Sequence, residues 1–413
     1  MTGTETLFDH ATRMIEPAPP HATVEDADPR ASVREEIRDR GVARSLHLSD
    51  RRTVFLVVPV IMLLIVGLGA MLSASSVISI RETGDHLFYI KRQIIWVGLG
   101  LAALVVFTKI PYRLYRQFAI PIFFVAVAGL VATLMFGDVR GGARRWIEVG
   151  PLTIQASEFA KLATVIILAA VLAKKDQLLR YLPHFLLPVI AILGVVSGLL
   201  LLQPDFGTTL LIGAAAFGML IASAAPLGFI VGLGGISAIL AVAGAFAMDY
   251  RRARITGFLD PFADPLGSGH QAVQSLVALG SGGWFGVGLG ASRARWSFLP
   301  NAHTDFIFAI IGEETGFVGA SLVIVLFAFF AAVGIRIALT APDTFGRLMA
   351  VGIVSWLTLQ ALVNVGGVIA VLPITGVPLP FVSSGGNAMI VSLAAVGILV
   401  NISRTRHAEP AAS

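Results

Sequence analysis

Residues 298–319 read FLPNAHTDFIFAIIGEETGFVG, and the apolar run that begins here continues to about residue 335. A helix of about 20 apolar residues is long enough to cross the ~30 Å hydrocarbon core of a membrane. Asp305 stands at the mouth of this run, and Glu313 and Glu314 follow about two turns further along. Ionisable residues in a membrane helix are energetically unfavourable and by default indicate a functional site, usually with a bonded partner. The stretch therefore predicts a membrane helix with chemistry near one end.

The composition extends this prediction to the whole chain. Of the 413 residues, 56% are hydrophobic and only 13% are charged, whereas soluble domains carry roughly 25% charged residues. The apolar runs do not alternate with polar residues, which excludes a β-barrel and leaves helices as the way to satisfy the backbone in lipid. The expected fold class is all-α, a polytopic membrane protein with about ten transmembrane helices. The expected spans are 54–76, 93–110, 118–137, 156–174, 185–202, 206–224, 227–247, 305–335, 348–370 and 388–402.

The segments outside the spans indicate an orientation. Residues 1–50 are polar and read as a disordered cytoplasmic tail, 51–405 as the membrane domain and 406–413 as a cytoplasmic C-terminal tail. Within the first tail, ASVREEIRDRGVARSLH is favoured as a solvated charge run, with a short amphipathic helix near the membrane as the alternative. Basic residues gather in alternate short loops, which predicts a cytoplasmic location for those loops and for both termini. A large extracytoplasmic loop, about 248–304, then joins spans seven and eight. The basic residues on the cytoplasmic side are Arg51, Arg52, Lys109, Arg113, Arg116, Lys174, Lys175, Arg180, Arg336, Arg347, Arg404 and Arg406.

Arginines on the opposite side run against this bias. They are Arg140, Arg144, Arg145, Arg251, Arg252, Arg254, Arg293 and Arg295. They could pair with Asp249, Asp260 and Asp264 or with lipid phosphates. Alternatively, they could hold an anionic ligand, because guanidinium groups bind phosphate in a bidentate manner. With a net charge of +5, the chain suits an anionic lipid or substrate, and we expect no nucleic-acid partner.

Four groups of ionisable residues have either a structural or a chemical role. Glu158 and Lys161 are three residues apart and share a helix face; they form either a membrane-edge ion pair or part of a functional site. Asp205, in LLQPDFGTTLL, is expected to cap the next helix. Asp305 is either an N-cap of the eighth span or a catalytic carboxylate at the water–membrane boundary. Of Glu313 and Glu314, at least one should point into the bundle with a bonded partner.

Several motifs are absent or misleading. The run GWFGVGLG at 283–290 follows no strand, so it is not a nucleotide-binding fingerprint. The segment HQAVQSLVALG has helical spacing and could lie on a membrane surface. LPITGVPLPFVSSGGN at 372–387 is rich in Pro and Gly, so it must pack on protein or line a cavity. The chain has no cysteine, which excludes thiolate metal sites and a cysteine nucleophile.

Taken together, the motifs resemble the SEDS family of shape, elongation, division and sporulation proteins, and within it FtsW more than RodA. The matching stretches occur in family order between about 140 and 390. They are GARRWI, SEFAKLA, LLQPDFGTTLL, FLDPFADPLGSGHQAVQSLVALGSGG, FLPNAHTDFIFAIIGEETGFVG, QALVNVGGVIAVLPITGVPLP and SSGGNA. The resemblance implies a peptidoglycan glycosyltransferase of the bacterial inner membrane that polymerises lipid II on the outer face during cell division. It also implies a class B penicillin-binding protein and other divisome membrane proteins as partners.

The resemblance also implies site residues. Asp305 takes the place of the essential aspartate of the family's HTDF motif, and Glu158 and Lys161 take the places of the functional pair in SEFAK. The residues expected to bind substrate are Arg144, Arg145, Arg254, His303, Thr304, Gln203, Ser383 and Ser384. A divalent cation, Mg²⁺ or Mn²⁺, is a candidate cofactor, although the sequence holds no recognisable ligand set. A lipid II flippase, a secondary transporter and a non-enzymatic division scaffold stay as alternatives.

Overall fold

The structure is a computed structural model that describes residues 29–140, 143–150, 152–174, 182–223, 225–246, 248–294 and 303–405. The chain divides into two units, Met1–Leu48 and Ser49–Ser413. In the first unit, the described residues are helical and belong to α1 (Pro29–Thr83). Residues 29–50, which we expected in a disordered tail, therefore differ from the expectation. Their sequence spaces Glu and Arg three or four apart, as in Glu35 and Arg38, a spacing that supports a helix. Residues 1–28 and 406–413 lie outside the described residues, and the domain boundaries stay predictions.

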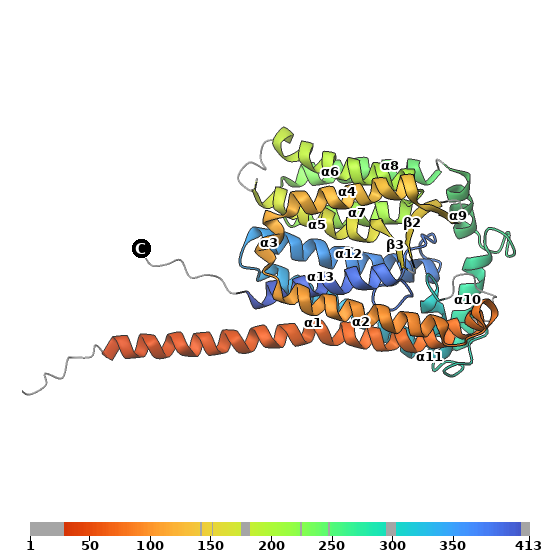
Figure 1. Cartoon of the computed structure of the whole chain (residues 1–413), viewed down its shortest axis with the longest axis horizontal. Coiled ribbons are helices and arrows are strands. Elements are labelled where there is room, and N and C mark those ends of the chain that lie inside the picture. The colour runs from red at the N-terminus through yellow and green to blue at the C-terminus, as the bar shows by residue number, and fades with distance from the viewer. Residues whose placement is uncertain are drawn as a thin grey trace, which may run out of the picture. The chain divides into compact units, whose positions relative to one another are not determined.

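The second unit is a bundle of long helices with a small sheet. After α1, the elements are α2 (Phe88–Lys109), α3 (Tyr112–Gln117), α4 (Ala119–Phe136), β1 (Asp138–Arg140), β2 (Ala143–Val149), β3 (Leu152–Ile154), α5 (Ala156–Lys174), α6 (Leu182–Leu202), α7 (Phe206–Ile221), α8 (Leu227–Phe246), α9 (Asp249–Leu259), α10 (His270–Gly282), α11 (Ile307–Leu339), α12 (Thr344–Val368) and α13 (Gly386–Arg404). The long helices run side by side, and β2, β3, α9 and α10 gather at one end of them (Figure 1). We call this the strand end of the bundle.

The helices account for the predicted spans. Among the described residues, seven helices are long and apolar enough to cross a membrane, namely Arg51–Thr83, Phe88–Lys109, Ala119–Phe136, Ala156–Lys174, Ile307–Leu339, Thr344–Val368 and Gly386–Arg404. Three shorter apolar helices are Leu187–Leu202, Phe206–Ile221 and Ile230–Gly244. Each predicted span falls on one of these ten helices, and the chain is a polytopic helical membrane protein as expected. The count of ten crossings and the extracytoplasmic place of residues 248–304 stay predictions.

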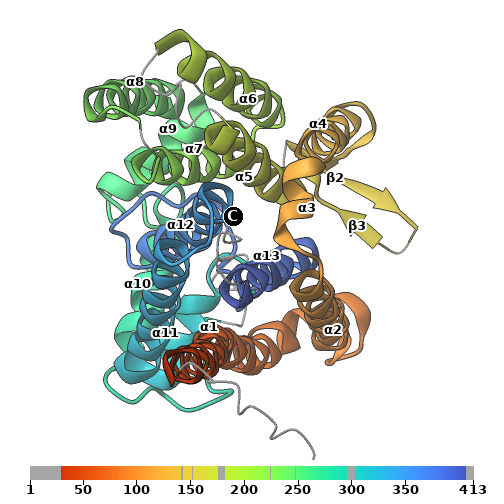
Figure 2. The same cartoon turned by 90° about the vertical axis from the view of Figure 1, so that its left-hand side faces the viewer.

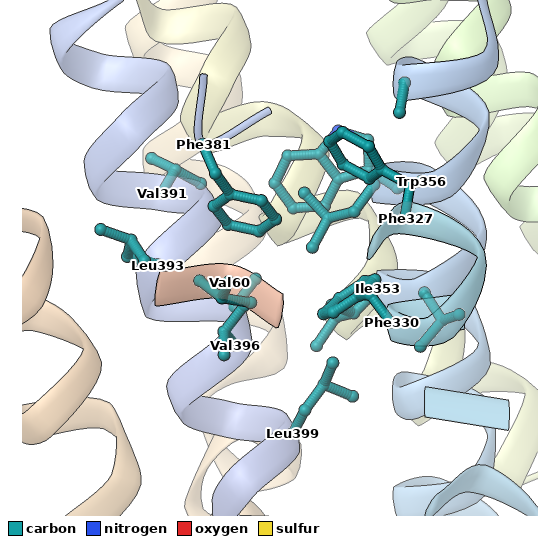
Figure 3. Packing of buried hydrophobic residues seen from close by; sticks show 14 of the residues in the cluster. Val60, Phe327, Phe330, Ile353, Trp356, Phe381, Val391, Leu393, Val396 and Leu399 are labelled. Atoms are coloured by element: carbon teal, nitrogen blue, oxygen red, sulfur yellow. The ribbon is translucent and has the colours of Figure 1, made fainter. Parts of the chain in front are cut away.

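The core of the bundle lies between α11, α12 and α13. Of the membrane-spanning helices, α5, α12 and α13 are the most buried and α2 and α4 the least, and the end-on view places α12 and α13 near the middle (Figure 2). Large side chains from different helices meet there (Figure 3). The Phe381 ring lies 6.4 Å from that of Phe327 and 6.0 Å from that of Phe330. Phe381 thus anchors the segment between α12 and α13 in the core.

The all-α expectation omits a three-stranded antiparallel sheet, in the order β1-β2-β3. In β2 and β3, Ile147 pairs with Ile154 and Val149 with Leu152. The sequence between the strands reads Gly-Gly at 141–142 and Gly-Pro at 150–151, and both residue types are common in tight connections. The strands are too short to stand out in the sequence beside the apolar helices. They place Arg145 and Trp146 at the strand end of the bundle.

Candidate active site

A cavity of about 840 Å³ opens at the strand end of the bundle. Its walls come from α2, the sheet, α5, the start of α7, α9, the residues before α11 and the segment before α13. The polar and aromatic lining residues are Tyr89, Arg92, Gln93, Trp96, Arg145, Trp146, Thr153, Gln155, Glu158, Asp205, Thr208, Arg254, Thr304, Asp305, Ser384 and Asn387. Of the residues that the sequence nominated, the cavity brings together Asp305, Glu158, Arg145, Arg254, Thr304 and Ser384.

Asp305 is half-buried in the wall of this cavity. Burial raises the pKa of its carboxyl from 3.8 to about 6, and the guanidinium groups of Arg254 and Arg145 oppose that rise. Gly376 lies beside both charged groups: a β-carbon built on it would be 3.7 Å from Asp305 Oδ2 and 3.8 Å from Arg254 Nη1, and its φ of +74° favours glycine. In the structure α11 begins at Ile307, and its N-cap is Phe306, which makes no side-chain capping bond. The capping interpretation of Asp305 is therefore wrong, and its carboxylate stays available to the cavity.

Asp305 is held in place by a side chain that the sequence analysis did not nominate. Asn364 Nδ2, on α12, donates to the carbonyl oxygens of Asp305 and Val377, both at 2.8 Å. Ser383 Oγ donates to Thr304 O at 2.6 Å. Through these bonds the residues before α11 and the segment before α13 are fixed to each other and to α12. The position of the carboxylate is thus set by three separate parts of the chain.

Glu158 and Lys161 are both buried and form an ion pair, with Lys161 Nζ 2.9 Å from Glu158 Oε2. Only Glu158 lines the cavity. Lys161 Nζ also donates to Gln360 Oε1 at 2.9 Å and lies 5.0 Å from the centre of the Trp356 ring. The sequence suggested a lysine that snorkels to the membrane edge or contacts substrate, and the structure places it in neither position. Lys161 instead neutralises and orients the carboxylate of Glu158.

Gln360 joins this pair to the cavity wall. Its Oε1 also accepts from Trp356 Nε1, and its Nε2 donates to Pro378 O, both at 2.8 Å. Gln360 and Asn364 are four residues apart on α12, so they lie on one face of that helix. Two polar residues four apart in an apolar span are the sequence pattern from which Gln360 and Asn364 could have been nominated.

Of the three arginines that the sequence nominated, two line the cavity and one does not. Arg145 donates to the carbonyl oxygens of Gln203, at 3.4 Å, and Pro204, and Arg254 Nη1 donates to Ile374 O at 3.1 Å. Arg144 is exposed and donates to Leu134 O, so the structure does not bring it to the site. Arg145 and Arg254 thus present cations anchored by backbone carbonyls.

Two of the three acidic residues proposed to neutralise the outer arginines accept hydrogen bonds from backbone amides. Asp260 Oδ1 accepts from Ala263 N, and Asp264 accepts from the amides of Gly267 and Ser268. These two carboxylates close turns in the loop after α9. The side chain of Asp249 lies outside the described residues. Two of the three carboxylates proposed as arginine partners thus bond to backbone amides of their own loop. This favours the interpretation that the cavity arginines hold an anionic ligand.

The other residues nominated to bind substrate lie near the cavity but do not line it. Gln203 is buried and donates to Leu130 O at 2.9 Å. His303 packs against Tyr89, with ring centroids 5.5 Å apart, and burial lowers its pKa. Neither these two nor Ser383 lines the cavity. Asp205 Oδ1 accepts from Thr208 N at 3.3 Å, which confirms its predicted capping role.

The cavity also contains groups that the sequence did not nominate. Arg92, Gln93 and Trp96 come from α2, and Asn387 Nδ2 donates to Thr153 O at 2.7 Å. Among the described residues, no three His, Cys, Asp or Glu side chains gather in a way that could hold a metal ion.

Fold and cavity define a multi-pass membrane protein with a carboxylate facing anchored cations at one end of its helices. A family model described as FTSW_RODA_SPOVE, cell cycle protein, matches residues 53–408. Stage V sporulation protein E of Bacillus subtilis (strain 168) is 40% identical over 355 residues, 85% of this chain and 96% of that protein. A protein of Trichlorobacter lovleyi named probable peptidoglycan glycosyltransferase FtsW is 40% identical over 339 residues, 82% of this chain and 89% of that one.

Two solved structures share the fold. One comes from work described as structural coordination of polymerization and crosslinking by a peptidoglycan synthase complex, with a TM-score of 0.71 and 28% identity over 86% of this chain and 98% of that chain. The other is the crystal structure of Thermus thermophilus rod shape determining protein RodA, with a TM-score of 0.63 and 27% identity over the same shares. The chain belongs to the FtsW/RodA/SpoVE family of cell cycle proteins, and the SEDS resemblance is confirmed.

Proposed function

We propose that this chain is a peptidoglycan glycosyltransferase that polymerises lipid II, a disaccharide-peptide carried on undecaprenyl pyrophosphate. One observation carries the proposal: the half-buried carboxylate of Asp305 lines a cavity of about 840 Å³ together with Arg145 and Arg254. The relatives named as peptidoglycan glycosyltransferases support the same activity. A site at the end of membrane helices suits a substrate with a lipid tail and a polar head.

In the proposed reaction, the 4-hydroxyl of the acceptor GlcNAc attacks the anomeric carbon of the donor MurNAc. The new C–O bond forms as the bond from that carbon to the pyrophosphate breaks, and undecaprenyl pyrophosphate leaves with the electron pair. The donor linkage is α and the product linkage β, so one inverting displacement is sufficient. Asp305 accepts the hydroxyl proton. A positioned base of this kind accelerates a reaction about 10² to 10⁴-fold, most effectively when its pKa lies near the working pH, and a pKa of about 6 meets that condition.

The cations of the cavity have a separate role. Negative charge develops on the pyrophosphate as it leaves, and preorganised donors stabilise such charge without reorganising during the reaction. Arg145 and Arg254 take this role because carbonyl oxygens already orient their guanidinium groups. Glu158 contributes a second carboxylate to the wall, and Lys161 positions it from behind. The proposed steps use only groups of the chain, and a divalent cation stays a candidate cofactor.

The cellular setting follows from the family. We infer that the helices cross the bacterial inner membrane, that both termini are cytoplasmic and that the cavity faces outward. The proposed partners are a class B penicillin-binding protein, which would crosslink the strands that this chain makes, and other divisome membrane proteins. The related peptidoglycan synthase complex coordinates polymerization with crosslinking and supports such a pairing. A role in cell division agrees with the FtsW relatives.

The test is polymerisation of purified lipid II by the purified chain, with and without the partner transpeptidase. Asp305→Asn is nearly isosteric and should abolish glycan polymer while the protein stays folded. Asp260→Asn is the matched control, because Asp260 is an exposed aspartate that does not line the cavity. Polymer made by the Asp305→Asn protein at the wild-type rate would refute the assignment.

The flippase alternative makes a different prediction. A flippase needs a polar path between leaflets, and Glu313 and Glu314 were the carboxylates that could line one. Both are buried, and both accept hydrogen bonds from other parts of the chain. Lipid II transport in liposomes that persists in Asp305→Asn, without polymer from the wild type, would favour a flippase. Binding of division proteins without either activity would favour a scaffold.

A further inference from the structure

The helix α11 is broken at Gly316, where φ is +68° and ψ is −166°. In a continuous helix, the amides of Phe317 and Val318 would donate to the carbonyls of Glu313 and Glu314, four residues earlier. Here they donate instead to Gly283 O at 2.8 Å and Trp284 O at 3.2 Å. The break is thereby closed by another part of the chain, the loop that follows α10.

The exchange is reciprocal. The freed carbonyl of Glu313 accepts from Val287 N at 3.0 Å, and that of Glu314 accepts from Gly288 N at 3.2 Å. The helix loses two hydrogen bonds, and the loop 283–288 pairs with all four backbone groups that this leaves free. Glycines permit the close approach, because a β-carbon on Gly286 would collide with Glu314 O and one on Gly316 would collide with the loop backbone. A backbone paired in this way does not require water.

Side chains hold the end of the loop as well. Glu313 accepts from Ser292 Oγ at 2.5 Å and from the amides of Arg293 and Ala294. Glu314 accepts from Ser73 Oγ on α1 and from Ser292 N. The expectation of at least one inward glutamate is confirmed, since both are buried and bonded. The loop is therefore fixed to α11 at both of its ends.

The outward side of this loop is apolar. Phe285 and Leu289 are 83% and 82% exposed, and Trp284, Phe317 and Val318 are also exposed. The rings of Trp284 and Phe317 meet edge to face, with centroids 5.2 Å apart. The sequence from 271 to 292 contains no Asp, Glu, Lys or Arg. We call Trp284, Phe285, Leu289, Phe317 and Val318 the aromatic wedge.

The length of α11 places the wedge at a membrane boundary. The helix ends at Leu339, and Phe317 lies about 22 residues before that end, or about 33 Å at 1.5 Å per residue. The hydrocarbon core is ~30 Å thick. If the Leu339 end lies at one surface, the wedge reaches the opposite one. Trp and other aromatic side chains favour this interfacial depth.

We propose that the aromatic wedge is an interfacial anchor, embedded in lipid at the outer water–hydrocarbon boundary. The surrounding lipid, rather than a protein partner, covers its exposed rings. The wedge continues the lipid-facing surface of α11, where Leu322 and Val325 are also exposed. Because the loop is bonded to α11 on both sides of the break, the anchor holds the part of α11 that follows Asp305 at a fixed depth.

The absence of cysteine from the chain permits a clean test. Phe285→Cys and Leu289→Cys are each labelled with a nitroxide, and the proteins are reconstituted in vesicles of phosphatidylethanolamine and phosphatidylglycerol. Collisions with oxygen, which concentrates in hydrocarbon, are compared with collisions with a water-soluble nickel chelate. Val125→Cys, exposed on the span α4, is the lipid-facing control, and Ala263→Cys, exposed between two aspartates, is the aqueous control.

We expect the ratio of oxygen to nickel collisions at 285 and 289 to be several-fold higher than at 263 and to approach the value at 125. A ratio equal to that at 263 would place the loop in water and overturn the proposal. Labels shielded from both reagents would show that protein covers the wedge, and would overturn it equally. The two positions are exposed, so neither label disturbs the core, and agreement between them guards against a local artefact of one variant.

Discussion

Replacing Arg254 by Gln should move the acid limb of the pH–rate profile upward. A β-carbon built on Gly376 would lie 3.7 Å from Asp305 Oδ2 and 3.8 Å from Arg254 Nη1. These two charged atoms are therefore no more than about 7.5 Å apart. At that distance the attraction of unit charges is about 0.6 to 2 kcal/mol for effective dielectric constants of about 80 to 20. This equals roughly 0.4 to 1.6 pKa units at 1.36 kcal/mol each.

The direction of the pKa change depends on the proposed role of Asp305 as the general base. Arg254 lowers the pKa of Asp305, so its removal raises that pKa further above about 6. The base must be ionised to accept a proton, and a higher pKa means that the ionised form is lost at a higher pH. The apparent pKa of kcat/KM for lipid II polymerisation, measured from pH 5 to 9, should therefore rise by about one unit.

The matched control for this experiment is Arg252→Gln. Arg252 lies on the same helix, is exposed and does not line the cavity. Its profile should keep the wild-type midpoint. A profile for Arg254→Gln that superimposes on the wild type after scaling, or that shifts downward, would refute the electrostatic coupling of Asp305 and Arg254.

Three further predictions concern stability. Asp305→Asn should raise the free energy of unfolding at pH 7.5 by about 1 kcal/mol. The pKa of Asp305 is about 6 in the folded protein, against its ordinary value of 3.8, so its ionisation destabilises the fold as pH rises from about 4 to about 6. Thermal unfolding should therefore show no gain in stability for Asp305→Asn below about pH 4. Lys161→Met should cost about 3–5 kcal/mol by leaving Glu158 buried without a counter-ion, and Glu158→Gln in the same protein should recover most of that loss. Gly286→Ala should destabilise the protein by about 1–3 kcal/mol more than Gly290→Ala, since both glycines have positive φ but only Gly286 would collide with a backbone carbonyl; equal losses would contradict the role assigned to the close approach.

The ten spans predicted from the sequence each fall on an apolar helix of the structure, because a long apolar run is what a helix in lipid requires. The sequence also nominated Asp305, which lines the cavity, since a charged side chain at the mouth of a span is costly to keep there without a structural or chemical role. It could not decide how Lys161 is placed, because spacing shows that Glu158 and Lys161 share a face but not which neighbour lies behind them. Gln360 occupies that position from a helix almost 200 residues away.

Other features depended on contacts that no local pattern encodes. Asn364 looks like an ordinary polar residue in an apolar span until its partners Asp305 and Val377 are known. The run GWFGVGLG was excluded as a nucleotide-binding fingerprint, and its glycines gained a meaning only through the break at Gly316. Tertiary pairing between distant segments is the information that was missing.

The hydrogen bonds between the loop and α11 also limit which insertions and deletions this region can tolerate during evolution. Residues 283–288 meet a fixed set of donors and acceptors, so one inserted or deleted residue would misalign all four bonds. The turn at 260–269 is closed by its own aspartates and is free of that restriction. Natural homologues should therefore vary in length at the turn and keep one length between Gly282 and Gly288.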